Sequence, residues 1–156
     1  MTEELRRIAG LEDLAALVGE PLGTSPWFEI DQERLNLFAD ATLDHQWIHV
    51  DPEKAATDSP YGSTIAHGFL TLSMMPHLRD RTYAVDGLTS TINYGLGKVR
   101  FPAPVRCGRR IRASFTLKEF EPRGDGSARV TVEAVIEVEG ETNPACVADS
   151  IVLLIP

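Results

Sequence analysis

Polar and apolar residues alternate with a period of two through much of the second half of the chain. The pattern covers residues 89–101, 111–118 and 129–138, and polar turn segments follow at 122–126 and 140–144. A strand with one buried face has this alternation, so we predict three such strands. The phase slips near Gly97, which predicts a β-bulge. Residues 145–155 are apolar at both parities and predict a more central strand.

The first half of the chain has helical spacing instead. Residues 3–18 form a weak helical pattern, and residues 25–30 form a short strand pattern. Asp31 can accept hydrogen bonds from the first turn of a helix that continues to about residue 42. Asp51 can cap a second, short helix, with Pro52 in the first helical position.

The most apolar helical segment covers residues 65–78. Its large side chains do not form a single stripe, which predicts a helix buried around most of its circumference. Ser63 or Thr64 can cap its start. Pro76 should kink or shorten it, because proline removes a backbone donor.

These elements predict an α+β fold in which an antiparallel sheet wraps around one buried helix. We expect a single domain over residues 1–156, with residues 1–24 as an N-terminal helical extension. Such a sheet has open edges, and therefore we expect a homodimer.

Composition excludes several classes of function. The 156 residues carry a formal net charge of −8, which disfavours a nucleic-acid binder. No stretch approaches the roughly 18 apolar residues of a membrane span. The first residues lack the basic and apolar regions of a secretion signal, and the two cysteines, Cys107 and Cys146, show no metal-binding or redox pattern. We expect a cytoplasmic protein with reduced thiols, no metal and no cofactor. The basic run 106–112 is either a strand entry with solvated arginines or an anion contact.

Candidate chemistry is concentrated in residues 42–49, which contain Asp44, His45 and His49. On a continuous helix, the five-residue separation would rotate Asp44 away from His49. The two converge only if the chain turns between them, and they could then activate one water molecule. The alternative is an aspartate that caps a turn and a histidine bonded to the backbone.

Gly68 is a second candidate. The first N–H groups of a helix have no intrahelical partner, and a glycine lets a ligand approach closely, so this position could bind an oxyanion. The alternative is a glycine that only permits close packing. The preceding His67 is predicted to cap or pack rather than to catalyse.

Three segments together resemble the MaoC-like (R)-specific enoyl-CoA hydratases, and among them the branch similar to nodulation protein N. The matching residues are Phe38-Ala-x-x-Thr-x-Asp44-x-Gln46-x-Ile-His49-x-Asp51-x-x-x-Ala55, Pro60-Tyr-Gly-x-x-Ile-Ala-His67-Gly68-Phe-Leu-Thr-Leu-Ser73 and Ile92-Asn-Tyr-Gly-x-x-Lys98-Val-Arg-Phe-Pro102. The resemblance covers nearly all of the chain after residue 25 and implies a hot-dog fold.

The resemblance implies hydration of a trans-2-enoyl thioester to the (R)-3-hydroxyacyl thioester, or the reverse. In that reaction Asp44 is the base, His49 shares the water and helps to deliver a proton, and the Gly68 N–H stabilises the thioester oxygen. The family pattern has an asparagine and a proline where this chain has Gln46 and Trp47, which could reshape the pocket wall. Where some members have a serine, this chain has Pro76.

The expected substrate is an acyl-CoA or acyl carrier protein thioester. We predict that Asn93 lines the pocket, although an ordinary sheet position is an equal alternative. The candidates for binding the phosphates of coenzyme A are Lys98, Arg100 and Arg106. Two other functions remain open: an acyl-CoA thioesterase on the same fold, and a non-catalytic acyl-binding subunit. The second would be expected to lack Asp44 and His49.

Overall fold

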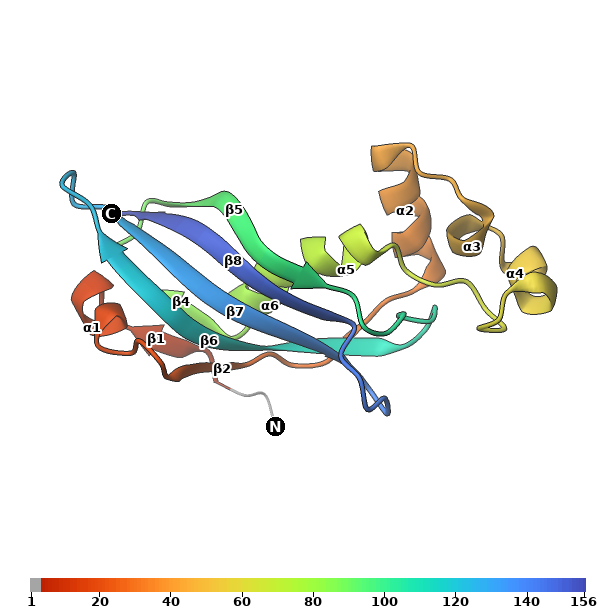
Figure 1. Ribbon diagram of the computed structural model, residues 1–156, viewed down its shortest axis with the longest axis horizontal. Coiled ribbons are helices and arrows are strands. Elements are labelled where there is room, and N and C mark those ends of the chain that lie inside the picture. The colour runs from red at the N-terminus through yellow and green to blue at the C-terminus, as the bar shows by residue number, and fades with distance from the viewer. Residues whose placement is uncertain (1–3) are drawn as a thin grey trace.

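The main sheet has six strands, and the computed structural model describes residues 4–156 of the chain (Figure 1). Strand order is β2-β6-β7-β8-β5, with the short β3 also paired to β6. The pairings within this sheet are antiparallel, as predicted. The bounds are β2 Pro21–Thr24, β3 Phe28–Glu29, β5 Ser90–Arg100, β6 Arg110–Pro122, β7 Ala128–Val138 and β8 Cys146–Ile155.

The period-two pattern marks the buried face correctly in β6 and β7. In β7, every second side chain from Ala128 to Val138 is buried, and in β6 Ile111, Ala113, Phe115 and Leu117 are buried. These side chains pack against those of the helices on one face of the sheet and form the core with them. The prediction of a more interior strand at 145–155 is also confirmed, because β8 lies between β7 and β5.

Strand β5 departs from the prediction, because its apolar side chains are not buried. Ile92, Tyr94 and Leu96 are each about half exposed, at 49%, 56% and 46%. The reason is that β5 is the last strand of the sheet, so no strand covers its outer edge (Figure 1). The bulge predicted near Gly97 is confirmed by a register shift between Leu96 and Val99, and a further shift lies between Asn93 and Gly95.

The helix inside the sheet is interrupted, as Pro76 predicts. It consists of α5, Gly68–Ser73, and α6, Met75–Asp80, which are joined at Met74. Leu70, Met75 and Leu78 are buried, but Phe69 is 70% exposed, so the prediction of an all-round buried helix is wrong at its start. The predicted caps are wrong too: the N-cap residue is His67, and the Thr64 hydroxyl donates to Gln32 Oε1 instead.

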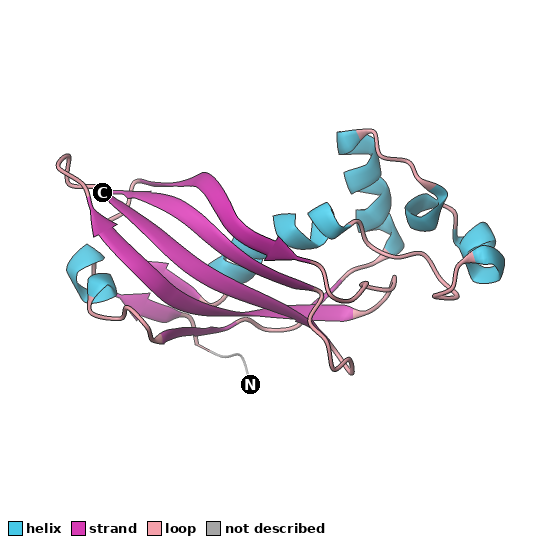
Figure 2. Ribbon diagram, viewed as in Figure 1, coloured by secondary structure: helices cyan, strands magenta, loops and turns pink. Residues whose placement is uncertain are grey.

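Three helices lie beyond the end of the sheet, next to the start of α5 (Figures 1 and 2). They are α2, Gln32–Thr42, α3, Trp47–Val50, and α4, Pro52–Asp58. Both predicted caps are confirmed: Asp31 accepts from the Arg34 N–H at 2.9 Å, and Asp51 accepts from the Lys54 N–H at 3.0 Å. The caps fix where each helix starts and therefore the direction of the connecting residues.

The first 24 residues are less helical than predicted. Among residues 4–24, only α1, Leu11–Ala15, is a helix. Strand β1, Arg6–Ile8, pairs in parallel with β4, Tyr83–Val85, and β2 belongs to the main sheet. Gly10 interrupts the helical pattern, and the segments before and after α1 form the strands β1 and β2 instead of continuing the helix. Residues 1–3 of the predicted extension lie outside the described residues.

Both cysteines are free thiols, in agreement with the prediction. Burial raises the pKa of the Cys146 thiol to about 11, so it behaves as an inert core side chain. Within residues 4–156, none of the helices is long and apolar enough to cross a membrane.

Candidate active site

The loop that carries Asp44 begins with an unusual backbone conformation. Helix α2 ends at Thr42, and Leu43 takes the left-handed conformation, with φ of 63°. This conformation is costly for leucine, by roughly 1–2 kcal/mol, because its Cβ crowds the following carbonyl. It turns the chain out of the helix immediately before Asp44. The turn needed to bring Asp44 towards His49 is therefore present.

His49 is held from two sides. It lies in α3, is 7% exposed, and its Nδ1 lies 2.7 Å from the Ile65 carbonyl oxygen. A carbonyl only accepts, so Nδ1 carries the proton and Nε2 remains as an acceptor. The main-chain carbonyl of His49 accepts from Gln32 Nε2 at 2.8 Å, and Gln32 Oε1 accepts from the buried Thr64 hydroxyl at 2.6 Å.

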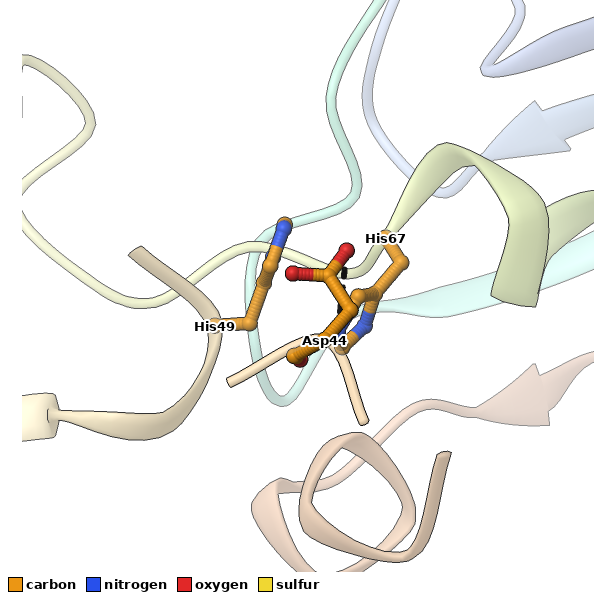
Figure 3. A group of neighbouring side chains, drawn as sticks. All are labelled: Asp44, His49 and His67. Carbon is orange, nitrogen blue, oxygen red and sulfur yellow. Dashed lines mark hydrogen bonds and ion pairs between the residues drawn. The ribbon is translucent and has the colours of Figure 1, made fainter. Parts of the chain in front are cut away.

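Asp44, His49 and His67 converge from three separate segments (Figure 3). One carboxylate oxygen of Asp44 and one ring nitrogen of each histidine all lie within 4.8 Å of one another. Two polar atoms about 4–5 Å apart can share one water molecule, because each hydrogen bond to water is about 2.8 Å long. The Asp44 side chain is 55% exposed, so water and substrate can reach it.

Sequence reasoning did not assign His67 to this group. Its Nε2 lies 3.0 Å from the main-chain oxygen of Asp44 and 4.0 Å from the carboxylate, and its ring stacks on that of His49. The contact joins residues 23 positions apart. The sequence signal that could have found it is the position immediately before Gly68.

Gly68 is the first residue of α5, so its N–H has no intrahelical acceptor. A Cβ at this position would lie 3.3 Å from the ring of Phe101, which follows β5. Close packing therefore explains part of the requirement for glycine. This packing leaves the Gly68 N–H available to a ligand. The geometry is therefore compatible with both interpretations of Gly68, oxyanion binding and close packing.

Burial governs the charge state of His49. Removal from water lowers the pKa of its imidazole below 6.5, the Ile65 hydrogen bond raises it, the neighbouring His67 lowers it, and the Asp44 carboxylate raises it. The net direction is downward, so the ring is neutral at pH 7 with Nε2 free to accept a proton.

The remaining predicted site residues lie at α3, beside Ile65 and on β5. Gln46 is the N-cap residue of α3, and Trp47 starts α3 beneath the Lys54 ammonium, which is 4.7 Å from its ring centroid. Arg106 forms an isolated bridge with Ile65, next to the histidines, whereas Lys98 and Arg100 lie on the exposed end of β5.

Asn93 lines a cavity of about 640 Å³ between the sheet and α5–α6. Most of the other lining residues are apolar, among them Leu72, Val132, Val152 and Leu154. The polar ones include Ser150 on β8 and, on α6, Arg79 and Asp80. Asp44, His49 and Gly68 do not line it. The link is α5, because Leu72 lies about one turn, or roughly 6 Å, beyond Gly68 in the same helix.

The same three side chains are of the types that bind metals. However, two of the four ring nitrogens already bond to carbonyls, and His67 Nδ1 is buried. An acid–base arrangement uses the remaining His49 nitrogen and the exposed carboxylate directly, and we interpret the cluster in this way.

Comparison with known proteins identifies the family. A model of the MaoC-like domain matches residues 13–141. This chain belongs to the MaoC-like family. The 3-hydroxyacyl-thioester dehydratase Z of Mycobacterium tuberculosis strain CDC 1551 / Oshkosh is 55% identical over 148 residues, which cover 95% of this chain and 97% of that protein. Nodulation protein N of Rhizobium leguminosarum bv. viciae is 45% identical, covering 92% and 90%.

The fold is confirmed by solved structures. The unliganded R-hydratase PhaJ1 of Pseudomonas aeruginosa superposes with a TM-score of 0.71 at 22% identity, covering 88% of this chain and 81% of that chain. An (R)-hydratase of A. caviae involved in PHA biosynthesis gives 0.70 at 22%, covering 89% and 96%. The predicted hot-dog fold, MaoC-like family and hydratase or dehydratase class are therefore correct.

We predict that His49 titrates below pH 6.5, because burial disfavours the imidazolium form. Its ring resonances, followed by NMR from pH 8 downward, should hold their neutral positions through pH 7 and shift only at more acidic pH. A His49→Asn variant assigns the signals by their loss. A midpoint at or above 6.5 would show that the burial and charge balance described here is wrong.

Proposed function

We propose that the protein hydrates trans-2-enoyl thioesters to (R)-3-hydroxyacyl thioesters, or catalyses the reverse dehydration. The observation that carries this proposal is the approach of the Asp44 carboxylate to the His49 ring nitrogen, beside the first N–H of α5. The 55% identical 3-hydroxyacyl-thioester dehydratase supports the substrate class.

The two groups orient the attacking water. The carboxylate of Asp44 and Nε2 of neutral His49 are both acceptors, so each takes one O–H of a shared water molecule. The lone pair of the water oxygen is then left to face the substrate. Asp44 removes a proton as the oxygen bonds to the β-carbon.

The electrons of the double bond move towards the thioester oxygen, where negative charge develops. The Gly68 N–H stabilises that charge, because it lacks an intrahelical partner and lies at the positive end of a helix. The proton that Asp44 took from the water is then passed to the α-carbon with the help of His49, which restores the carboxylate and the neutral imidazole. The sum is one water added across one double bond, with no redox change.

We propose that the three exposed cations, Lys98, Arg100 and Arg106, bind the phosphates of coenzyme A. Arg100 immediately precedes Phe101, whose ring packs on Gly68, and Arg106 lies beside Ile65. Lys98 is on the same end of β5. Phosphate groups attract such residues, although exposed ion pairs contribute only modestly.

Turnover of crotonyl-CoA tests the reaction. We expect the wild-type protein to bleach the enoyl chromophore, and Asp44→Asn and His49→Ala each to lower kcat by roughly 10²–10⁴-fold, the usual contribution of an acid–base group. His45→Ala, an exposed histidine of the same loop paired to Asp40, is the matched control and should keep full activity. If both single variants retain full activity, the assignment is wrong. Release of free thiol without bleaching would identify a thioesterase.

The cavity beneath the sheet would accept the far end of the acyl chain. It is largely apolar, its volume is in the range of ligand pockets, and it begins one helical turn past Gly68. Ser150 has the same parity on β8 as the buried Val152 and Leu154, so its side chain faces the cavity.

A Ser150→Phe variant should therefore lose at least about tenfold in kcat/KM for a dodecenoyl thioester while retaining crotonyl-CoA activity, because bulk fills only the far pocket. The control is Ile151→Phe, which adds an aromatic ring on the opposite face of the same strand. Equal loss on both substrates, or no loss on the long one, would exclude this cavity as the acyl site.

We also propose that two copies pair through β5. This strand is at the sheet edge, and its Ile92, Tyr94 and Leu96 are about half exposed. An unpaired edge with apolar side chains is the surface that proteins usually cover. Two antiparallel β5 edges related by a twofold axis satisfy each other's backbone groups.

Light scattering should give twice the 17.1 kDa of one chain. Ile92→Lys places a charge on the proposed edge and should shift the population to monomer. Val18→Lys, which alters a similarly exposed side chain distant from β5 in sequence, should remain dimeric. A monomeric wild type, or an Ile92→Lys dimer of unchanged affinity, would contradict the pairing.

A further inference from the structure

His67 is a buried histidine that the proposed mechanism does not use. Its side chain is 3% exposed, and it occupies the N-cap position of α5 without forming a side-chain cap bond. Its contacts are directed towards the two groups that the proposed reaction requires. One contact is to the main chain of Asp44, and the other is to the ring of His49.

The hydrogen bond to Asp44 determines where His67 carries its proton. The acceptor is a main-chain carbonyl oxygen at 3.0 Å, so Nε2 must be the donor. The bond fixes the peptide of Asp44 directly after the strained residue Leu43. The Asp44 side chain is itself exposed and does not anchor the loop. The bond from His67 to the Asp44 main chain therefore holds the carboxylate in place.

The ring face of His67 holds the second group. Its centroid lies 3.7 Å from that of His49, with an interplanar angle of 23°, and the ring of Phe38 packs against it at 4.9 Å. The stacked arrangement restricts rotation of the His49 ring about its side-chain bonds. His49 Nδ1 remains on the Ile65 carbonyl, and the direction of Nε2 is fixed.

Packing alone does not account for a histidine at this position. The other ring nitrogen, Nδ1, is buried and has no hydrogen-bond partner among the described residues. Burying a polar atom without a partner is destabilising, and a phenylalanine or leucine would avoid that cost. The expected compensation is the donor on the opposite side of the ring.

We propose that His67 is a positioning residue, which fixes Asp44 through its Nε2–H and His49 through its ring face, so that both groups address one water molecule. The inference rests on the proposed hydration reaction for its kinetic readout. His67 does not touch the reacting atoms in this account, and its effect is exerted through Asp44 and His49.

Two substitutions separate the two contacts. His67→Phe keeps a stacking ring and removes the donor, whereas His67→Gln keeps an N–H near the position of Nε2. We expect His67→Phe to lower kcat for crotonyl-CoA by at least about 30-fold with KM changed by less than about twofold, and His67→Gln to recover most of that loss. His77→Phe is the matched control, since His77 lies in α6 and its ring packs edge-on against that of Phe28 in β3.

A purely structural role would reduce the folded fraction but leave the turnover of folded molecules unchanged. Wild-type kcat in His67→Phe, or equal losses in His67→Phe and His67→Gln, would overturn the proposal. The circular dichroism spectrum and melting temperature of each variant normalise the rates to folded protein.

Long-range ¹H–¹⁵N spectra test the same assignment without turnover. In the wild type, His67 should be the Nε2–H tautomer and His49 the Nδ1–H tautomer, and the signals of His49 should change in His67→Phe. If that variant does not fold, the wild type and His67→Gln carry the test. A proton on His67 Nδ1, or His49 signals unaffected by either substitution, would overturn the proposal. Wild-type protein that shows these tautomers but does not hydrate crotonyl-CoA would reject the proposed function instead.

Discussion

Two hydrogen bonds between residues 48–49 and Ile65 hold the candidate site together. The Ile65 N–H donates to the Ile48 carbonyl at 3.0 Å, and the Ile65 carbonyl accepts from His49 Nδ1 at 2.7 Å. Helices α2, α3 and α4 lie beyond the end of the sheet (Figure 1). The two bonds of Ile65 tie α3, which carries His49, to the segment that leads into the helix that starts at Gly68.

The proposed chemistry depends on an asymmetry between Asp44 and His49. His49 is buried, and burial lowers the pKa of its ring so that it is a neutral acceptor, whereas Asp44 lies on an exposed loop and is open to substrate. Gln32 ties the His49 main chain to Thr64, and His67 ties the Asp44 main chain to the same end of α5. The strained Leu43 is tolerated because these contacts determine the path of the loop.

The sequence predicts correctly those elements that are determined by local pattern alone. β6 and β7 are covered on one face, so alternation was sufficient, and the Asp31 and Asp51 caps depend only on nearby residues. The prediction of a buried face on β5 is wrong because alternation does not reveal a sheet edge. The caps expected at Ser63 or Thr64 fail because Thr64 bonds Gln32, 32 residues away. The family motif predicts the Asp44/His49 pair, but the proposed contribution of His67 depends on contacts that spacing cannot indicate.

The central claim is that Asp44 and His49 act on one shared water molecule, and a double-mutant cycle tests it most directly. Groups that act as a unit have strongly non-additive effects on rate. The kcat for crotonyl-CoA hydration should be compared in wild type, Asp44→Asn, His49→Asn and the double variant, each normalised to folded protein. The account predicts that the double variant is no slower than the slower single variant by more than about threefold. Losses that multiply in full would contradict it, because they would show that the two groups act independently.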